Sequence, residues 1–197
     1  RALVAQTERQ PARFVQQRVL AMPGRGANVP VWILGSSLFG AQLAAALGLP
    51  FAFASHFAPA QMMQAIALYR AQFQPSKHLT KPYVMLGFSV FCADTDEHAA
   101  YLASSVQQSF LSLRSGRPIA LPPPKHDFLS TLNPEQNAVI DNILNCAAIG
   151  SPAAVQARVQ AFIAKTGADE LMIAGAMFDH EARLKSYSLL ASLAHNF

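Results

Sequence analysis

A turn of one glycine and two serines, Gly35-Ser36-Ser37, is the stretch of this 197-residue chain whose residue types most directly suggest chemistry. It follows the apolar run 31–34, which is typical of a buried strand, and precedes a helical pattern that ends at Gly48. Such a turn places two hydroxyls beside the unpaired N–H groups and the positive end of a helix dipole, which together suit a phosphate. Serine is also a favoured helix cap wherever a helix begins. An anion site and a plain cap therefore both stay open.

Polar residues also follow the other predicted strands. His56 and Asp94 come after two of them, and Asp179-His180 follows the last. His56 is the one candidate catalytic residue that the sequence offers, set against a hydrogen-bonded turn histidine; all other catalytic residues stay unknown. Asp179 is predicted to cap the last helix rather than to take part in chemistry. The six histidines and two cysteines are dispersed without metal-ligand spacing, so we predict no metal site.

Strand and helix patterns alternate along the chain. Each apolar strand run is followed by apolar residues at helical spacing; Phe39, Leu43 and Leu47, for example, share one face of the first helix. Asp94 and Glu97 have the spacing of a capping box. Four strand–helix units predict a parallel sheet with helices outside, either a small doubly wound sheet or half of an eight-stranded barrel. The predicted strands are 31–34, 51–55, 83–93 and 171–177.

The length of the chain fits one domain, which we assign to residues 1–197. Residues 1–28 read as a lead-in segment, and the proline-rich stretch 117–134 reads as an irregular insertion, because the alternation resumes after it. The chain begins with Arg1, not Met, so we expect that it starts inside a longer gene product or after processing.

Composition excludes several classes of function. Hydrophobic residues make up 52% and charged residues 13%, which indicates that part of the surface meets a partner or a further segment. No apolar run approaches ~20 residues, so we expect no membrane span. The net charge of +4 comes from scattered Lys and Arg, which gives no support for nucleic-acid binding. Cys92 and Cys146 lie in apolar contexts and are predicted to be buried free thiols, and we expect a cytoplasmic protein.

The motifs, taken in order, resemble the bacterial luciferase-like, flavin-dependent monooxygenase family. The resemblance covers nearly all of residues 29–195. It is carried by Pro30-Val-Trp-Ile-Leu-Gly-Ser-Ser37, Ala41-Gln-Leu-Ala-Ala45, Gly48-Leu-Pro-Phe-Ala-Phe-Ala54, Pro82-Tyr-Val-Met-Leu-Gly87, Ala93-Asp-Thr-Asp-Glu97, Gly150-Ser-Pro152, Thr166-Gly-Ala-Asp-Glu-Leu-Met172, Asp179-His180 and Arg183-Leu-Lys-Ser-Tyr187.

Members of this family are (β/α)8 barrels of the TIM type, about twice as long as this chain. The resemblance therefore implies an α/β fold that forms the C-terminal part of such a barrel, from the fifth strand on, with 117–134 as the late insertion. The family's catalytic residues lie largely in the first strands, which have no counterpart here. None of them can be assigned to this sequence.

The resemblance also implies a cofactor and its site. Ser36 and Ser37 would hold the phosphate of FMN through hydroxyls and N–H groups, with first-turn N–H groups from Leu38, Phe39 and Gly40. Gly35 belongs to the same turn, and Ser55 matches the strand end near the flavin ring. Phe39 stands where some relatives have a hydroxyl residue, so one side-chain contact is expected to be missing.

The implied function is a monooxygenase that uses reduced FMN and O2 to oxygenate a small organic substrate, with a flavin reductase as its supplier. One alternative is an oxidoreductase that uses a deazaflavin (coenzyme F420) in the same fold. Another is a non-catalytic half-barrel that serves as a binding or assembly module. A half-barrel has two unpaired strand edges, so we expect a homo-oligomer or cover from the missing N-terminal half.

Overall fold

A computed structural model describes residues 22, 24 and 29–197. The chain divides into two units, residues 1–31 and residues 32–197, and everything below concerns the second. The lead-in segment 1–28 falls almost wholly outside the described residues. Its assignment to the same domain as the rest of the chain stays a prediction.

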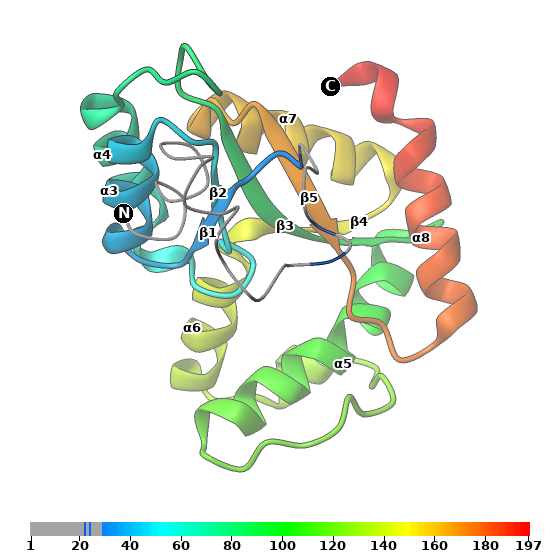
Figure 1. Cartoon of the computed structure of the whole chain (residues 1–197). Helices are drawn as coiled ribbons and strands as arrows, with labels where there is room; N and C mark the ends of the chain where they lie inside the picture. The colour runs from blue at the N-terminus through cyan, green and yellow to red at the C-terminus, as the bar shows by residue number, and fades with distance from the viewer. Residues whose placement is uncertain (1–21, 23, 25–28) are drawn as a thin grey trace. The chain divides into compact units, whose positions relative to one another are not determined.

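The second unit alternates strands with helices, as the sequence pattern predicts (Figure 1). The strands are β1 (Ile33–Gly35), β2 (Phe51–Phe53), β3 (Val84–Cys92), β4 (Ala147–Gly150) and β5 (Glu170–Ala174). The α-helices are α3 (Leu38–Leu47), α4 (Met62–Gln72), α5 (Asp96–Arg114), α6 (Pro134–Ile143), α7 (Pro152–Thr166) and α8 (His180–Ser192). The 3₁₀ turns are η1 (Pro59–Gln61), η2 (Phe128–Thr131), η3 (Leu144–Cys146) and η4 (Ala194–Asn196).

All the strand pairs are parallel, which confirms the predicted sheet. β2 and β5 lie on opposite edges of β3, because Leu86 is paired with Phe53 of β2 and with Leu171 of β5 at once. β1, β2, β3 and β5 therefore follow one another across the sheet in chain order. A doubly wound sheet reverses its direction at a switch point, whereas a barrel does not. The order and the unclosed sheet fit part of a barrel.

The short strand β4 is absent from the sequence prediction. It pairs only with the carboxyl end of β3, from Ser89 to Cys92. Four residues that begin with two alanines, directly after the turn η3, give too short an apolar run to be separated from the end of the preceding helix. This strand lies outside the barrel-like order and extends the sheet at the carboxyl end of β3.

One face of the sheet packs against the helices and holds the core. Phe51, Phe53, Leu86, Phe88 and Tyr69 of α4 are all buried there. Figure 1 shows α3 and α4 beside β1 and β2, with α8 on the other side of β5. The buried Tyr69 hydroxyl donates to the Leu49 carbonyl oxygen at 2.9 Å, so its polar end is satisfied within the core.

The opposite face, here called the inner face, is defined by the strand register. Leu34 pairs with Ala52, Ala52 with Met85, and Gly87 with Met172, so these five residues point to one side. Two of the large side chains are strongly exposed, Leu34 by 71% and Met172 by 56%. In a closed barrel this face would be the interior.

Two predictions about the first unit of strand and helix are wrong. The strand is not covered on both faces, since Leu34 is exposed on the inner face. The helix α3 buries Gly40, Ala41, Ala44 and Ala45 instead of the predicted stripe, and Phe39 is 71% exposed. Small residues let α3 approach its neighbours closely, so packing against β1 and α4 selects the alanine face over the larger apolar one.

Candidate functional site

The first turn of α3 follows the carboxyl end of β1, and no side chain of the described residues caps it. Ser37 is the N-cap residue with an extended backbone, yet its side chain makes no capping hydrogen bond. The first turn carries no acidic residue, and Ser36 and Ser37 are exposed. The first N–H groups of an α-helix have no partner within the helix. This helix start therefore offers N–H donors, hydroxyls and a positive dipole end to an outside anion.

Two glycines bring the helix start close to the strand end. A Cβ atom added to Gly40 would lie 3.3 Å from the Cα atom of Gly35 and 3.5 Å from the Phe51 ring. The reverse contact, from Gly35 to the Cα atom of Gly40, is 3.4 Å. Neither glycine has a positive φ, so the close approach of two backbones explains them. The turn forms a tight cradle that side chains at these positions would fill.

Two other helices that follow strands, α5 and α8, have side-chain caps, whereas α7 begins, like α3, without a side-chain cap or a first-turn acid. Thr95 caps α5 by accepting from the His98 N–H at 3.2 Å, and Asp179 caps α8 by accepting from the Ala182 N–H at 2.7 Å. The Asp179 cap confirms the sequence prediction. The predicted role of Asp94 is wrong, because Thr95 is the cap and Asp94 forms an ion pair with Lys185.

At the end of β2, the neighbouring residues Ser55 and His56 both contact Gly87 of β3. Ser55 is fully buried, and its hydroxyl donates to the Gly87 carbonyl oxygen at 2.6 Å. The ring of His56 occupies the space that a Gly87 side chain would need. A buried hydroxyl engaged in this way supports the strand end, and direct contact of Ser55 with a cofactor stays a prediction.

His56 carries an unusual polar atom. Its Nδ1 is enclosed and has no hydrogen-bond partner among the described residues. Burial lowers the pKa of His56 below its usual value, which favours the neutral ring. Sequence reasoning singles out His56 but misses Gly87. The signal that could have found Gly87 is an isolated glycine inside a strand pattern, which indicates a close backbone approach.

The two thiols are buried and free, as predicted. Cys146 lies in the core beside Ser55, where burial raises the pKa of its thiol to about 11 while the Ser55 hydroxyl acts in the opposite direction. Burial likewise raises the pKa of Cys92. Thiols with raised pKa values are poor nucleophiles near neutral pH, so neither is a candidate catalytic group.

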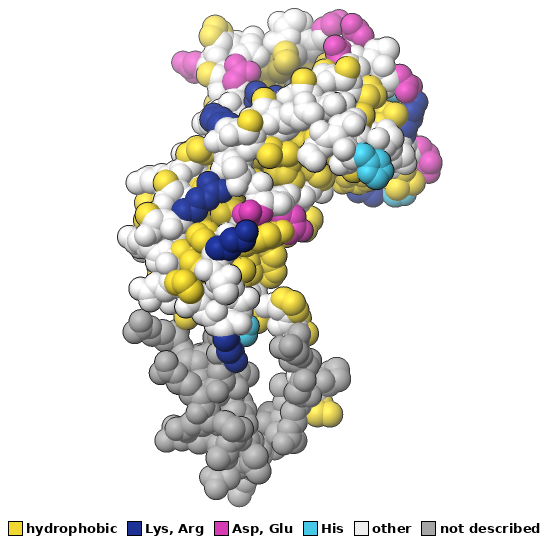
Figure 2. Space-filling model, turned by 90° about the horizontal axis from the view of Figure 1, so that it is seen from above, with side chains coloured by type: hydrophobic (Ala, Val, Ile, Leu, Met, Phe, Trp, Pro, Cys, Tyr) yellow, Lys and Arg dark blue, Asp and Glu magenta, His cyan; other side chains and the backbone are white. Residues whose placement is uncertain are grey.

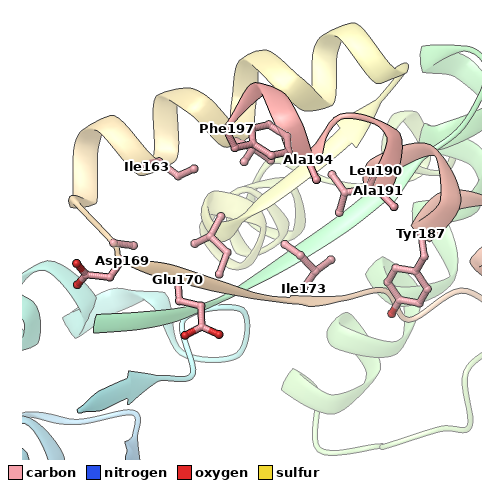
Figure 3. A pocket seen from close by; sticks show the side chains of 12 residues that line it. Ile163, Asp169, Glu170, Ile173, Tyr187, Leu190, Ala191, Ala194 and Phe197 are labelled. Atoms are coloured by element: carbon pink, nitrogen blue, oxygen red, sulfur yellow. The ribbon is translucent and has the colours of Figure 1, made fainter. Parts of the chain in front are cut away.

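A pocket of about 540 Å³ lies apart from these strand ends, beside β5 (Figure 3). Its floor is β5, and its walls come from α7 and α8. Asp169 and Glu170 lie at one end, while Tyr187 lies at the other. The rest of the lining is apolar: Val159, Ile163, Ala168, Leu171, Ile173, Leu190, Ala191, Ala194 and Phe197. The pocket lies between β5 and its helices, away from the carboxyl ends of the strands. Its apolar lining therefore indicates a packing surface and not the candidate site.

On the face drawn in Figure 2, the surface charges of the described residues form no basic patch. Lys and Arg side chains are scattered there among hydrophobic ones instead of forming a stripe. Within the described part of the chain, no group of three or more His, Cys, Asp or Glu residues is placed to hold a metal ion. None of the helices described is both long enough and apolar enough to cross a bilayer.

Comparison with known proteins identifies the family. The family model described as luciferase-like monooxygenase matches residues 4–170. The chain belongs to the luciferase-like monooxygenase family. It is 45% identical over 178 residues to a luciferase-like monooxygenase of Escherichia coli K12, with 90% of this chain and 53% of that protein aligned. It is 42% identical over 186 residues to the Bacillus subtilis protein YvbT, with 94% and 55% aligned.

A solved structure supports the same assignment. The crystal structure of apo-MsnO8 matches with a TM-score of 0.73 and 28% sequence identity, covering 91% of this chain and 55% of that one. The chain thus spans about half the length of the curated relatives that it matches. This luciferase-like chain has a parallel sheet, and the edge strands β1 and β5 both end without a further partner among the described strands.

Proposed function

We propose that this luciferase-like chain binds the phosphate end of FMN and acts in a monooxygenase reaction on a small organic substrate. The open first turn of α3 carries the proposal. It combines an uncapped helix start, two exposed serines and the absence of any acid. The glycine contact between Gly35 and Gly40 keeps the cradle free of side chains.

Each residue of the turn has a distinct part in this proposal. Ser36 and Ser37 donate from hydroxyls, and the N–H groups of Leu38, Phe39 and Gly40 complete the shell around the phosphate. Reduced FMN, when bound, supplies the electrons that activate O2 for oxygen transfer. The apolar inner face, with exposed Leu34 and Met172, would exclude water from the ring end once that face is covered. A flavin reductase is the proposed source of reduced cofactor.

Titration of the chain with FMN and with reduced FMN tests the proposal. We expect saturable binding that weakens by at least about tenfold when Ser36 and Ser37 are both replaced by leucine, because the bulky side chains remove two hydroxyls and crowd the cradle. Ser130→Leu, at another exposed serine, serves as the matched control. Absence of FMN binding, or unchanged affinity in the double variant, would count against the phosphate site.

A deazaflavin is the alternative cofactor. Its tail also carries a phosphate, which needs the same N–H and hydroxyl donors from the first turn of α3. The chemistry would then be hydride transfer without oxygen. Oxygen consumption during turnover distinguishes the two cofactors. FMN chemistry predicts oxygen uptake in step with substrate loss, and the deazaflavin reaction predicts none.

We further propose that the inner face is covered by the additional half-barrel that the longer relatives have. β1 pairs only with β2, and β5 only with β3, among the described strands, so both outer edges offer unpaired backbone groups. Exposed Leu34 and Met172 lie on the face between them. Sedimentation of the chain alone is expected to show self-association. A stable, folded monomer would contradict the need for cover.

A further inference from the structure

Backbone conformation does not explain why residue 87, which contacts His56, is a glycine. Gly87 lies in the middle of β3 and does not have a positive φ. A Cβ atom added there would overlap Nδ1 of His56 and lie 2.8 Å from Cε1. Glycine at this position therefore makes room for the imidazole ring. The direction of that missing Cβ also places the ring on the inner face, with Met85 and Met172.

Neighbouring hydrogen bonds hold the segment that carries the ring. The buried Ser55 hydroxyl donates to the Gly87 carbonyl oxygen, which ties the residue before His56 to the strand that the ring covers. The Ala54 N–H donates to the Gly35 carbonyl oxygen at 2.9 Å, which joins the same segment to the turn before α3. His56 is thus held by both neighbouring strands. An exposed turn histidine would have no such support.

The two ring nitrogens of His56 have different surroundings. Nδ1 is enclosed without a partner among the described residues, whereas Nε2 is not among their enclosed, unpartnered atoms. A buried N–H without an acceptor is rarer than an unsatisfied acceptor, so we assign the proton of the neutral ring to Nε2. Nε2 then presents an N–H donor on the inner face.

We propose that His56 donates a hydrogen bond from Nε2 to the ring system of the flavin whose phosphate lies at α3. The inference rests on the proposed function and adds a residue for the other end of the cofactor. The α3 turn follows β1, and the imidazole lies over β3, two strands away. At the usual spacing this is about 10 Å, a separation that suits a ligand with a phosphate at one end and a ring at the other.

Binding of FMN and of riboflavin, which lacks the phosphate, tests the two ends separately. In His56→Asn the amide lies near the Nδ1 position, and we expect affinity for both flavins to fall about three- to tenfold. In His56→Gln the amide reaches the Nε2 position, and affinity is expected to stay within about twofold of the parent chain. Gly87→Ala displaces the ring and is expected to match His56→Asn.

Nitrogen-15 NMR of the His56 ring gives a readout that does not depend on activity. We expect the Nε2 resonance to shift on addition of riboflavin, while Nδ1 keeps the shift of an unprotonated nitrogen. FMN binding that is unchanged in His56→Asn, with a static Nε2 resonance, overturns this inference alone. Failure of the parent chain to bind either flavin overturns it together with the proposed function.

Discussion

The helices α3 and α5 both begin where a parallel strand ends, yet their first turns are built in opposite ways. α5 has Thr95 as a bonded cap and two acids, Asp96 and Glu97, in its first turn. α3 has a cap residue without a side-chain bond and no acid. In α5 the chain supplies its own negative charge to the helix dipole, whereas in α3 the same demand is left unmet.

Asp96, in the first turn of α5, also reaches the start of α7. Its Oδ1 atom accepts from the Ser151 N–H at 2.6 Å, at the start of α7. A first-turn carboxylate of α5 thus binds the backbone N–H of the N-cap residue of α7. No comparable side chain reaches the first turn of α3 among the described residues. α7 also begins without a side-chain cap or a first-turn acid, so what sets α3 apart is its pair of exposed serines beside the close contact of Gly35 and Gly40.

The largest expected effect comes from giving α3 the acid that α5 has. Phe39 is an exposed first-turn residue, so Phe39→Glu should not disturb the core. We expect FMN affinity to fall about ten- to hundredfold through charge repulsion, while the free energy of unfolding rises by about 0.3–1 kcal/mol through the helix dipole. Fluorescence titration and urea unfolding measure the two effects.

The matched control for that variant is Phe39→Gln, which has a similar shape to Phe39→Glu and no charge. It should keep FMN affinity within about threefold of the parent chain. Equal losses in both variants would show that the aromatic ring of Phe39, not the charge at the helix start, supports binding.

A smaller effect separates the two caps. Thr95→Ala removes a capping hydrogen bond and should lower the free energy of unfolding by about 1 kcal/mol. Ser37→Ala removes a hydroxyl that makes no such bond, so its cost should stay within about 0.5 kcal/mol. Urea unfolding without ligand measures both. A Ser37→Ala cost equal to that of Thr95→Ala would mean that Ser37 is an ordinary cap.

The smallest expected effect is a pH dependence of stability that comes from Asp96 in the first turn of α5. The hydrogen bond from the Ser151 N–H lowers the pKa of Asp96 below its usual 3.8. A carboxylate with a depressed pKa contributes stability above its unfolded pKa, and that stability is lost as the pH falls through the folded pKa. Asp96→Asn should therefore lose less melting temperature than the parent chain between about pH 6 and pH 2.

Thermal unfolding across that pH range decides the Asp96 prediction. Ser36→Asn, an exposed change at the other helix start, should follow the pH profile of the parent chain. Parallel profiles for Asp96→Asn and the parent chain would remove the proposed link between α5 and α7.

Local patterns predict much of the fold. The long apolar run 83–93, interrupted only at Gly87 and Ser89, and the Asp179 cap depend on neighbours in sequence, and both are predictable from it. The strand at Ala147–Gly150 is not, because four residues give too little periodicity. The buried face of α3 also differs from the predicted one, since close packing against β1 and α4 selects small residues over large apolar ones.

Site geometry is predictable only where one segment makes it. The turn from Gly35 to Gly40 is local, so its residue types by themselves reduce the possibilities to an anion site or a plain helix cap. The contacts of Ser55 and His56 with Gly87 join the end of β2 to β3. They depend on strand register, which the sequence pattern does not specify. The ion pair between Asp94 and Lys185 is likewise a long-range contact, so local spacing wrongly favours a capping role for Asp94.

The central claim is that the first turn of α3 binds a phosphate, and the most direct measurement compares FMN with riboflavin. These ligands share the ring and differ at the phosphate alone. Dissociation constants for the parent chain and for Phe39→Glu should show FMN bound at least about tenfold more tightly than riboflavin by the parent, with that preference lost in the variant. Equal affinities for FMN and riboflavin in the parent chain would contradict the phosphate site.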